Sequence, residues 1–365
     1  MPTPAATPDP ARTGRIQDLP KAHLHLHFTG SMRLATLHEL AEKHRLRLPD
    51  ALKQGGWPPK LSGRDERGWF RFQRLYDAAR ACVRDESDVR RIVREAAEDD
   101  VAEGSRWLEI QIDPTSYAGG LGGITPVLQI VLDEARHAST DLPIGVGVIV
   151  AASRIRHPMD ARALARLAAH HAGDGAGQVL GFGLSNDERR GVTSEFAPAF
   201  AIAREAGLGS VPHAGELLGP QSVSETLDSL APDRLGHGVR SVESDSVLAR
   251  VVDSGVALEV CPTSNVALGV YATPDHVPLR RLVDAGARVA LGADDPLLFG
   301  RRLADQYTLA HDILDFDDAA LAKLARSSFD ASFAPADVRA AADHDIDTWL
   351  ASRQAPDEDA AQDQD

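Results

Sequence analysis

The stretch SEFAPAFAIAREAGLGSVPH, residues 194–213, holds the structural unit that decides the fold. Its first part, 194–206, has helical periodicity and stops before Gly207, a residue type that commonly ends helices. Its last part, 209–213, is short and apolar, as a buried strand is. Helices that alternate with buried strands are typical of parallel α/β folds.

The same unit recurs along the chain. The predicted strands are 21–27, 106–112, 144–151, 179–184, 209–213, 233–237, 256–261 and 288–293. The predicted helices are 32–45, 87–103, 124–137, 159–171, 194–206, 222–230, 244–254 and 278–285. Eight rounds of strand and helix predict a TIM-type (β/α)8 barrel, an α/β fold whose usual size is about 250 residues. A doubly wound sheet is the alternative.

The composition is that of a globular protein, 43% hydrophobic and 25% charged over 365 residues. We expect one barrel domain over residues 16–353, between a disordered tail at 1–15 and an acidic disordered tail at 354–365. The net charge is −15, and part of it lies in the acidic tail. Such a charge is unsuited to nucleic acids or anionic membranes, which require a basic surface.

Two further observations favour a cytoplasmic protein. No signal peptide or transmembrane segment is predicted, because the N-terminus lacks an apolar core and no run of 18 apolar residues occurs. The two cysteines, Cys82 and Cys261, exclude a disulfide scaffold and a multi-cysteine zinc cluster. No feature of the sequence indicates an oligomeric state.

A long insertion separates the first two predicted strands and includes GWPPKLSGRDERGWFRFQRLYDAARACV, residues 56–83. In a barrel this segment lies at the C-terminal rim, where active sites are built. We expect a helical lid over the site, formed by apolar side chains. The alternative is that the same side chains pack the helix against the barrel: Trp69, Phe70, Phe72, Leu75 and Tyr76.

Candidate catalytic side chains follow four of the predicted strands. His25 and His27 end the first strand, and their spacing directs both imidazoles to one face. Others follow the fifth, sixth and eighth strands: His213, Glu216, His237, Asp294 and Asp295. Because all strands of a barrel end at the same rim, these residues become neighbours on folding.

Three imidazoles and a carboxylate, from His25, His27, His213 and Asp294, form a ligand set suited to Zn²⁺. Such an ion lowers the pKa of a bound water from 15.7 to about 7. Glu216 and His237 are then left as acid–base groups. Hydrolytic deamination needs this combination of a nucleophilic water, a base that orients it and an acid that protonates the ring nitrogen.

Five motifs together resemble the signature of the adenosine deaminase family, within the amidohydrolase superfamily. They occur in order over about residues 18–335: His25-Leu26-His27, His213-Ala214-Gly215-Glu216, Gly236-His237-Gly238, Cys261-Pro262-Thr263-Ser264-Asn265 and Asp294-Asp295-Pro296-Leu297. The resemblance implies that the four ligands above bind zinc, that Glu216 donates a proton to purine N1 and that His237 orients and deprotonates the water.

The resemblance also implies contacts with the base. Asp295 would form a hydrogen bond at purine N7. The segment 181–188, which contains Gly183 and Asn186, resembles the fourth-strand motif of the family, whose backbone reaches the base near N3.

The positions of the lysines predict one zinc ion per chain. Binuclear members of the superfamily commonly bridge two metals with a carbamylated lysine, and no lysine occurs between Lys60 and Lys323. A glutamate bridge is the alternative. Zinc deaminases with cysteine ligands are excluded, because their Pro-Cys-x-x-Cys motif is absent.

The residues after the His-x-His pair depart from the family pattern. Adenosine-specific members have Leu-Asp-Gly there, and the Asp binds the 5′-hydroxyl of ribose, whereas this chain has Phe28-Thr29-Gly30. Loss of the carboxylate suggests that Thr29 faces a different substituent. The aromatic side chains near Phe72 and Tyr76 suit the large 5′ extension of 6-aminodeoxyfutalosine, an intermediate of menaquinone biosynthesis.

The predicted activity is the zinc-dependent deamination of a small purine nucleoside, either adenosine or a 5′-modified adenosine such as 6-aminodeoxyfutalosine. The alternatives are an adenine deaminase, another hydrolase of the superfamily and a non-catalytic binding protein. The joint occurrence of the ligand, acid and base motifs argues against the last two.

Overall fold

The computed structural model describes residues 16–354, and its centre is an eight-stranded sheet. Neighbouring strands are parallel and follow one another in chain order. The strands are β1 (Lys21–His27), β2 (Ser105–Ile112), β3 (Gly145–Ser153), β4 (Val179–Ser185), β5 (Gly209–Ala214), β6 (Arg234–His237), β7 (Ala257–Val260) and β8 (Arg288–Leu291).

The first and last strands lie side by side and nearly close the sheet into a barrel. Leu26 of β1 forms a bridge with Asp294, which follows β8. The N–H of His27 donates to the carbonyl oxygen of Asp294 at 3.1 Å, and the N–H of Asp294 donates to that of His25 at 2.9 Å. The predicted (β/α)8 barrel is confirmed, and the doubly wound alternative is wrong.

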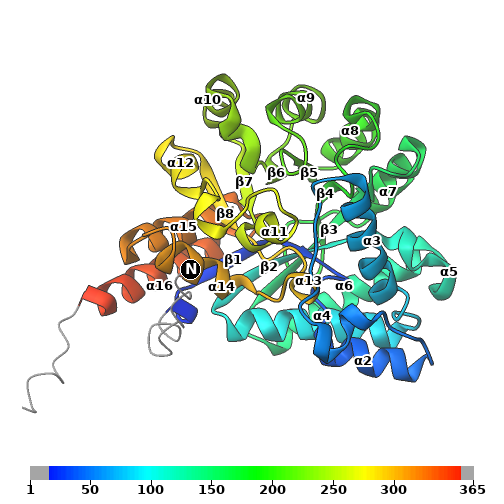
Figure 1. Cartoon of the computed structure of the whole chain (residues 1–365). Coiled ribbons are helices and arrows are strands. Elements are labelled where there is room, and N and C mark those ends of the chain that lie inside the picture. The colour runs from blue at the N-terminus through cyan, green and yellow to red at the C-terminus, as the bar shows by residue number, and fades with distance from the viewer. Residues whose placement is uncertain (1–15, 355–365) are drawn as a thin grey trace, which may run out of the picture.

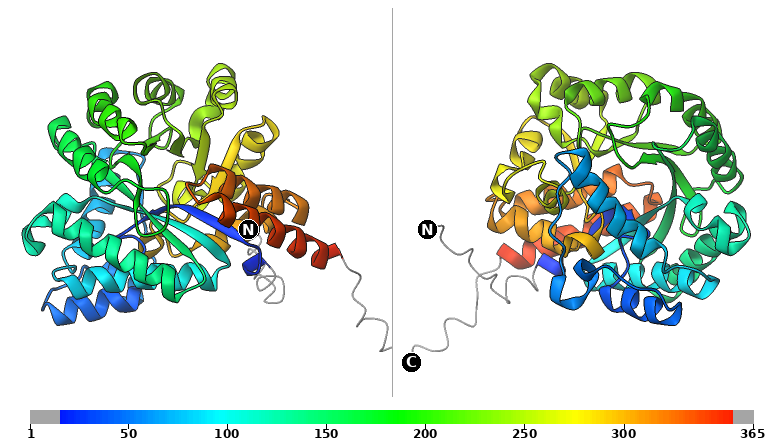
Figure 2. Two further views of the ribbon diagram at one scale, coloured as in Figure 1. Left: turned by 180° about the vertical axis from the view of Figure 1, so that it is seen from behind. Right: turned by 45° about the vertical axis from the view of Figure 1, so that its right-hand side comes forward.

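Helices surround the barrel (Figures 1 and 2). Their bounds are α2 (Leu34–Lys43), α3 (Glu66–Arg80), α4 (Glu86–Ala102), α5 (Ala118–Leu121), α6 (Ile124–Asp141), α7 (Pro158–His170), α8 (Ala197–Glu205), α9 (Pro220–Leu230), α10 (Asp245–Ser254), α11 (Pro262–Ala267), α12 (Leu279–Asp284), α13 (Pro296–Phe299), α14 (Leu303–Asp312), α15 (Asp318–Ala331) and α16 (Ala336–Gln354). The short 3-10 turns are η1 (Asp50–Leu52), η2 (Gln54–Gly56), η3 (Pro114–Ser116), η4 (Thr193–Phe196), η5 (Val239–Glu243) and η6 (Pro274–His276).

All eight predicted strands and all eight predicted helices occur, with ends that differ by a few residues. The sequence analysis did not predict the helices that follow β8. Among them, α15 packs against β8 and β1, where the hydroxyl of Ser328 accepts a hydrogen bond from the N–H of Ala22 at 3.0 Å. This helix thus covers the seam at which the barrel closes.

The insertion between β1 and β2 forms α2, η1, η2, α3 and α4, and α3 crosses the barrel mouth (Figure 1). Trp69 and Phe72 are buried, and the Phe72 ring stacks on that of Phe299 at 5.9 Å. The two predicted roles, a lid over the site and packing of the helix against the barrel, are therefore not exclusive. The same rings pack the helix and line the cavity below it. Phe70 is 63% exposed, so its predicted place in the apolar cluster is wrong.

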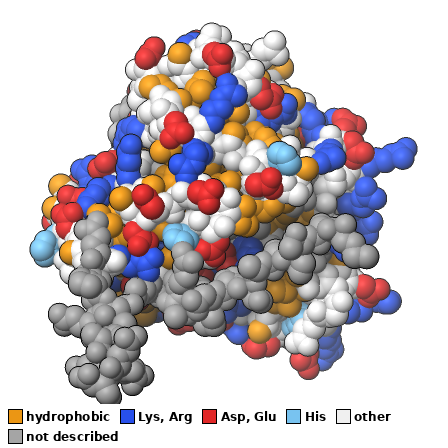
Figure 3. Space-filling view, turned by 60° about the vertical axis from the view of Figure 1, so that its left-hand side comes forward, with side chains coloured by type: hydrophobic (Ala, Val, Ile, Leu, Met, Phe, Trp, Pro, Cys, Tyr) orange, Lys and Arg blue, Asp and Glu red, His pale blue; other side chains and the backbone are white. Residues whose placement is uncertain are grey.

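The two predicted tails lie outside the described residues, apart from Gln354, which ends α16. The division into one domain and two tails stays a prediction. Within residues 16–354, no helix has the length and apolar character needed to span a bilayer. Acidic and basic side chains are interspersed on the face shown in Figure 3. Cys82 and Cys261 are buried free thiols.

Candidate active site

The carboxyl ends of β1, β5 and β6 and the residues after β8 bring four imidazoles and a carboxylate together. The ring centroid of His25 lies within 5.1 Å of three others, those of His27, His213 and His237. Asp294 Oδ1 lies 3.3 Å from His27 Nε2. The structure thus places side by side the residues that the barrel topology was expected to gather.

Four of these residues have the surroundings of a metal site. Ligand atoms of His25, His27 and Asp294 lie within 4.8 Å of one another. The Nε2 atoms of His25 and His213 are buried and have no hydrogen-bond partner in the described part of the chain. The ligand atoms of a second group also lie within 4.8 Å of one another, those of His25, His213 and His237. His237 therefore lies next to the candidate metal site.

The charge states of two of the candidate ligands, His27 and His213, suit a metal ion as well, whereas the pKa of His25 is raised by its hydrogen bond to Glu259 in spite of its burial. Burial lowers the pKa of His27 to about 4, and it lowers the pKa of His213 well below its usual value. Both rings are therefore neutral at pH 7, the state in which imidazole binds metals. Three nitrogens and one carboxylate oxygen are ligands that Zn²⁺ accepts in catalytic sites.

A chain of buried charges fixes the His25 ring from behind. His25 Nδ1 lies 2.7 Å from Glu259 Oε2 on β7, and Glu259 Oε1 accepts a hydrogen bond from Arg234 Nε on β6 at 2.6 Å. Arg234 also donates to Glu109 on β2. Because the carboxylate engages Nδ1, Nε2 is the nitrogen left for a metal ion. None of the charged residues behind His25 was among the predicted site residues.

Gly236 lets two of the imidazoles approach each other. A Cβ atom at this position would lie 2.6 Å from His213 Cδ2 and 3.0 Å from His25 Cε1. Any larger residue would therefore displace one of the rings. Position 236 therefore requires glycine for steric reasons, since a side chain there would collide with the imidazoles.

Glu216 and His237 lie beside the candidate ligands. Glu216 Oε1 is 3.6 Å from His237 Nε2, which is 3.8 Å from Asp294 Oδ2. Burial raises the pKa of Glu216 well above its usual value, and the nearby Asp294 carboxylate raises it further. Burial, with a smaller contribution from His25, lowers the pKa of His237 to about 3. The two shifts go in opposite directions and favour a protonated Glu216 beside a neutral His237.

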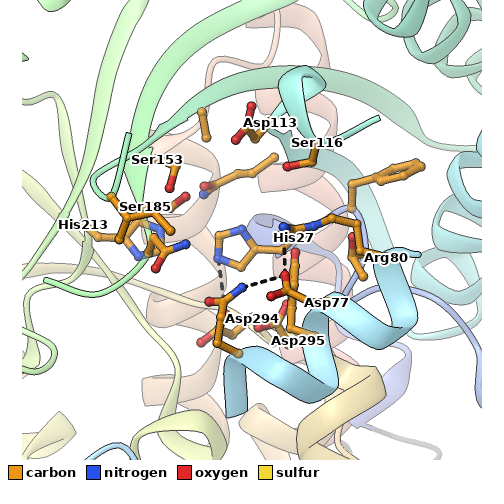
Figure 4. Close-up of a pocket in the computed structure, with 18 of the residues that line it drawn as sticks. His27, Asp77, Arg80, Asp113, Ser116, Ser153, Ser185, His213, Asp294 and Asp295 are labelled. Atoms are coloured by element: carbon orange, nitrogen blue, oxygen red, sulfur yellow. Dashed lines mark hydrogen bonds and ion pairs between the residues drawn. The ribbon is translucent and has the colours of Figure 1, made fainter. Parts of the chain in front are cut away.

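A cavity of about 190 Å³ opens beside these residues (Figure 4). Gly183 and His25 are not among its lining residues, since His25 is buried beneath it and Gly183 lies two residues deeper in β4 than the lining residue Ser185. The other predicted site residues all line it: His27, Thr29, Phe72, Tyr76, Asn186, His213, Glu216, His237, Asp294 and Asp295.

Asp295 has an oxygen without a partner. The residue is 3% exposed, and its Oδ1 atom accepts no hydrogen bond from any described residue. Burial raises the pKa of Asp295 well above its usual value, and Asp294 adds to this effect. A protonated carboxyl group can donate a hydrogen bond to a ring nitrogen.

Helix α3 contributes a polar wall that the sequence analysis did not predict. Arg80 lies over the Tyr76 ring, 4.9 Å from its centroid, and donates to Asp77 Oδ1 at 3.0 Å. Asp113 and Ser116, after β2, line another part of the same cavity (Figure 4). None of these residues belongs to a motif, so only the placement of α3 across the mouth reveals them.

The Thr29 hydroxyl is already engaged. It forms a hydrogen bond with the phenol of Tyr117, whose ring packs edge-on against Phe28 at 5.3 Å. Thr29 is 1% exposed. Thr29 itself therefore offers no charged acceptor to a ligand.

Comparisons with known proteins agree with this geometry. The family model for adenosine deaminase matches residues 20–349. The chain is 58% identical to a putative adenosine/adenine deaminase of Streptomyces coelicolor, over 93% of this chain and 99% of that protein. It is 32% identical to the aminodeoxyfutalosine deaminase of Streptomyces avermitilis, over 95% of this chain and 97% of that protein.

Solved structures share the fold. The adenine deaminase of Arthrobacter aurescens has a TM-score of 0.83 and 29% identity, over 91% of this chain and 99% of that one. An amidohydrolase of Burkholderia ambifaria, solved with bound Zn, has a TM-score of 0.82 and 25% identity, over 96% and 97% of the two chains. The chain belongs to the adenosine deaminase family of the amidohydrolase superfamily and is a deaminase-type hydrolase.

Proposed function

We propose that the chain uses one zinc ion to hydrolyse the 6-amino group from an adenosine-type purine nucleoside, giving the 6-oxo purine and ammonia. The observation that carries the proposal is the group of candidate metal ligands beside Glu216, whose pKa is raised, and His237, whose pKa is lowered. A metal-binding group, an acid and a base in one cavity are what hydrolytic deamination requires.

The proposed zinc ligands are His25, His27, His213 and Asp294. The unpartnered Nε2 atoms of His25 and His213 support this assignment. When bound, the ion supplies Lewis acidity that activates a water at the site. The stretch without lysine between Lys60 and Lys323 supports a single ion.

Two residues without a ligand role would move the protons. Glu216 donates a proton to purine N1, which makes C6 more electrophilic, and His237 orients the attacking water and accepts its proton. The side-chain amide of Asn265 lies 3.4 Å from His237 Nδ1 and restrains the ring. The new C6–O bond forms, the C6–N bond breaks, and the amino group takes up a proton and leaves as ammonia.

The base would be held on its other edges by residues of the cavity wall. The carboxyl group of Asp295, whose raised pKa favours the protonated form and whose Oδ1 has no partner among the described residues, would donate to N7. Near N3 we propose Ser185 and Asn186, which line the cavity, in place of Gly183, which lies deeper.

The extent of the cavity supports a nucleoside rather than a free base. Beyond the catalytic residues it continues between α3 and the turn after β2, where Asp77, Asp113 and Ser116 line it. Carboxylates and a hydroxyl are suitable partners for the hydroxyl groups of a sugar.

A 5′-modified nucleoside is favoured over adenosine by the surroundings of Thr29. Position 29 is a threonine whose hydroxyl is bonded to Tyr117, so it offers no carboxylate to a 5′-hydroxyl. Trp69, Phe72 and Tyr76 give an apolar wall against which a larger 5′ substituent can pack.

The rates with adenine, adenosine and 6-aminodeoxyfutalosine test these proposals. We expect kcat/KM for the better nucleoside to exceed that for adenine by about 100-fold or more, because polar groups that bind the sugar are left unpaired by the free base. A preference for adenine would contradict the nucleoside proposal but not deamination. A preference for adenosine over 6-aminodeoxyfutalosine would contradict the 5′ proposal alone.

A Glu259→Gln substitution is expected to weaken zinc binding by about 10- to 100-fold. The substitution replaces the charged carboxylate that accepts from His25 Nδ1 with a neutral amide, which orients the ring less strongly. Competition with a chromophoric chelator measures the affinity. Glu103→Gln is the matched control, since Glu103 accepts a backbone hydrogen bond from Ala304 and does not line the cavity. Equal zinc affinity in the two variants would refute the role of Glu259.

A further inference from the structure

The loop that carries Glu216 is wrapped around the carboxylate of Glu188. The hydroxyl of Ser222 donates to Glu188 Oε1 at 2.5 Å. Four consecutive backbone N–H groups also donate to this carboxylate, at 2.6 to 3.0 Å: those of Gly215, Glu216, Leu217 and Leu218. Glu188 is 3% exposed, so these five bonds replace its contacts with water.

The pattern of bonds is that of an ionised carboxylate. Four of the five partners are backbone N–H groups, which can only donate, and the Ser222 hydroxyl can donate as the fifth. Successive N–H groups that converge on one point form an anion-binding nest, and Gly215 has the positive φ, 70°, that such a nest uses. Helix α9 has no acidic residue in its first turn and no side-chain cap. Glu188, which binds Ser222 in that turn, supplies the negative charge that a helix N-terminus favours.

Glu188 connects two walls of the cavity. It follows β4, two residues after the lining residue Asn186, and it binds the loop after β5 from that side. The guanidinium of Arg240 donates to the carbonyl oxygen of Leu217 at 2.5 Å. Arg240 therefore gives the backbone of this loop a second anchor besides Glu188. The side chain of Glu216, by contrast, has its Oε1 atom 3.6 Å from Nε2 of the His237 imidazole, beyond the usual length of a hydrogen bond.

We propose that Glu188 is a positioning residue for the general acid, because its carboxylate holds the backbone of residues 215–218 where the Glu216 side chain meets purine N1. The inference rests on the proposed role of Glu216. Glu188 would affect the rate of proton donation through the loop, without touching the substrate or the metal ion. Misplacement of a catalytic group by about 1 Å can lower a rate by about 100-fold.

Glu188→Gln tests the proposal, since one side-chain oxygen becomes an NH₂ group that faces at least one backbone N–H donor in either orientation of the amide. We expect kcat to fall by about 10- to 100-fold, with KM changed by less than about threefold and zinc content unchanged. A loss of zinc in parallel with kcat, or an unchanged kcat, would overturn the proposal.

The decisive measurement compares Glu188→Gln in two backgrounds. If Glu188 acts through Glu216, the double variant Glu188→Gln/Glu216→Gln has the same kcat as Glu216→Gln alone, within about twofold. The same loss in both backgrounds would mean that Glu188 acts independently, and would overturn the inference while leaving the proposed function intact. A Glu216→Gln variant with normal kcat would refute the proposed function itself.

Two further variants control for folding. Asp88 is a buried carboxylate that accepts the backbone N–H groups of Arg84 and Asp85 and does not line the cavity. Asp88→Asn is expected to lower the thermal stability but not kcat, and an equal loss of kcat would show that destabilisation explains the effect. If Glu188→Gln does not fold, Ser222→Ala removes one of the five donors. We then expect about fivefold lower kcat in the native background only, and an unchanged kcat would overturn the proposal.

Discussion

Glu216→Gln is expected to lower kcat by about 10²- to 10⁴-fold while the protein retains one zinc ion per chain. The amide has nearly the shape of the carboxyl group but cannot donate a proton of comparable acidity to purine N1. Burial raises the pKa of Glu216 and so favours the protonated form of the native side chain. The absorbance change on deamination gives kcat, and elemental analysis gives the zinc content.

The effect should fall on kcat more than on KM, because proton donation stabilises the transition state and not the bound substrate. Glu225→Gln is the matched control, since Glu225 lies on α9 and is exposed outside the cavity. It should retain normal kcat. A Glu216→Gln enzyme with near-normal kcat would refute the assignment of the general acid.

The barrel was predictable because its strands are buried on both sides. Each strand therefore reads as a short apolar run, such as 144–151 or 179–184, followed by a helix with one apolar face. The error at Phe70 has a simple cause. It is adjacent to Trp69 on α3, and neighbouring residues of a helix point about 100° apart, so both cannot face the barrel.

The candidate site was predictable to the extent that it consists of residues at strand ends. His27 and His213 lie on different strands and Asp294 follows a third, yet the closed barrel places them at one rim. Glu188 and Glu259 were missed for a different reason. A glutamate in a strand or loop has no local signal for the buried donors it meets, because those donors come from segments distant in the sequence.

Asp294→Ala is expected to lose zinc and activity together. Asp294 contributes the only carboxylate of the proposed ligand set, and its Oδ2 also accepts a hydrogen bond from Ser264 at 2.6 Å. Changes to groups that only orient a ligand weaken metal binding by about 10- to 100-fold, so loss of a ligand should exceed about 100-fold. Elemental analysis after dialysis against a chelator, together with kcat, measures both losses.

Asp294→Asn separates the ligand charge from the backbone. Asp294 has a φ of 62°, a left-handed conformation that asparagine adopts more readily than alanine. The asparagine variant should therefore keep the closure of the barrel between β1 and β8 and the thermal stability of the zinc-free protein, yet still bind zinc weakly. Asp295→Asn is the adjacent control and should retain stoichiometric zinc while losing affinity for the purine. Stoichiometric zinc in Asp294→Ala would contradict the ligand assignment, because a site that lost a ligand would not bind zinc as tightly as the native site.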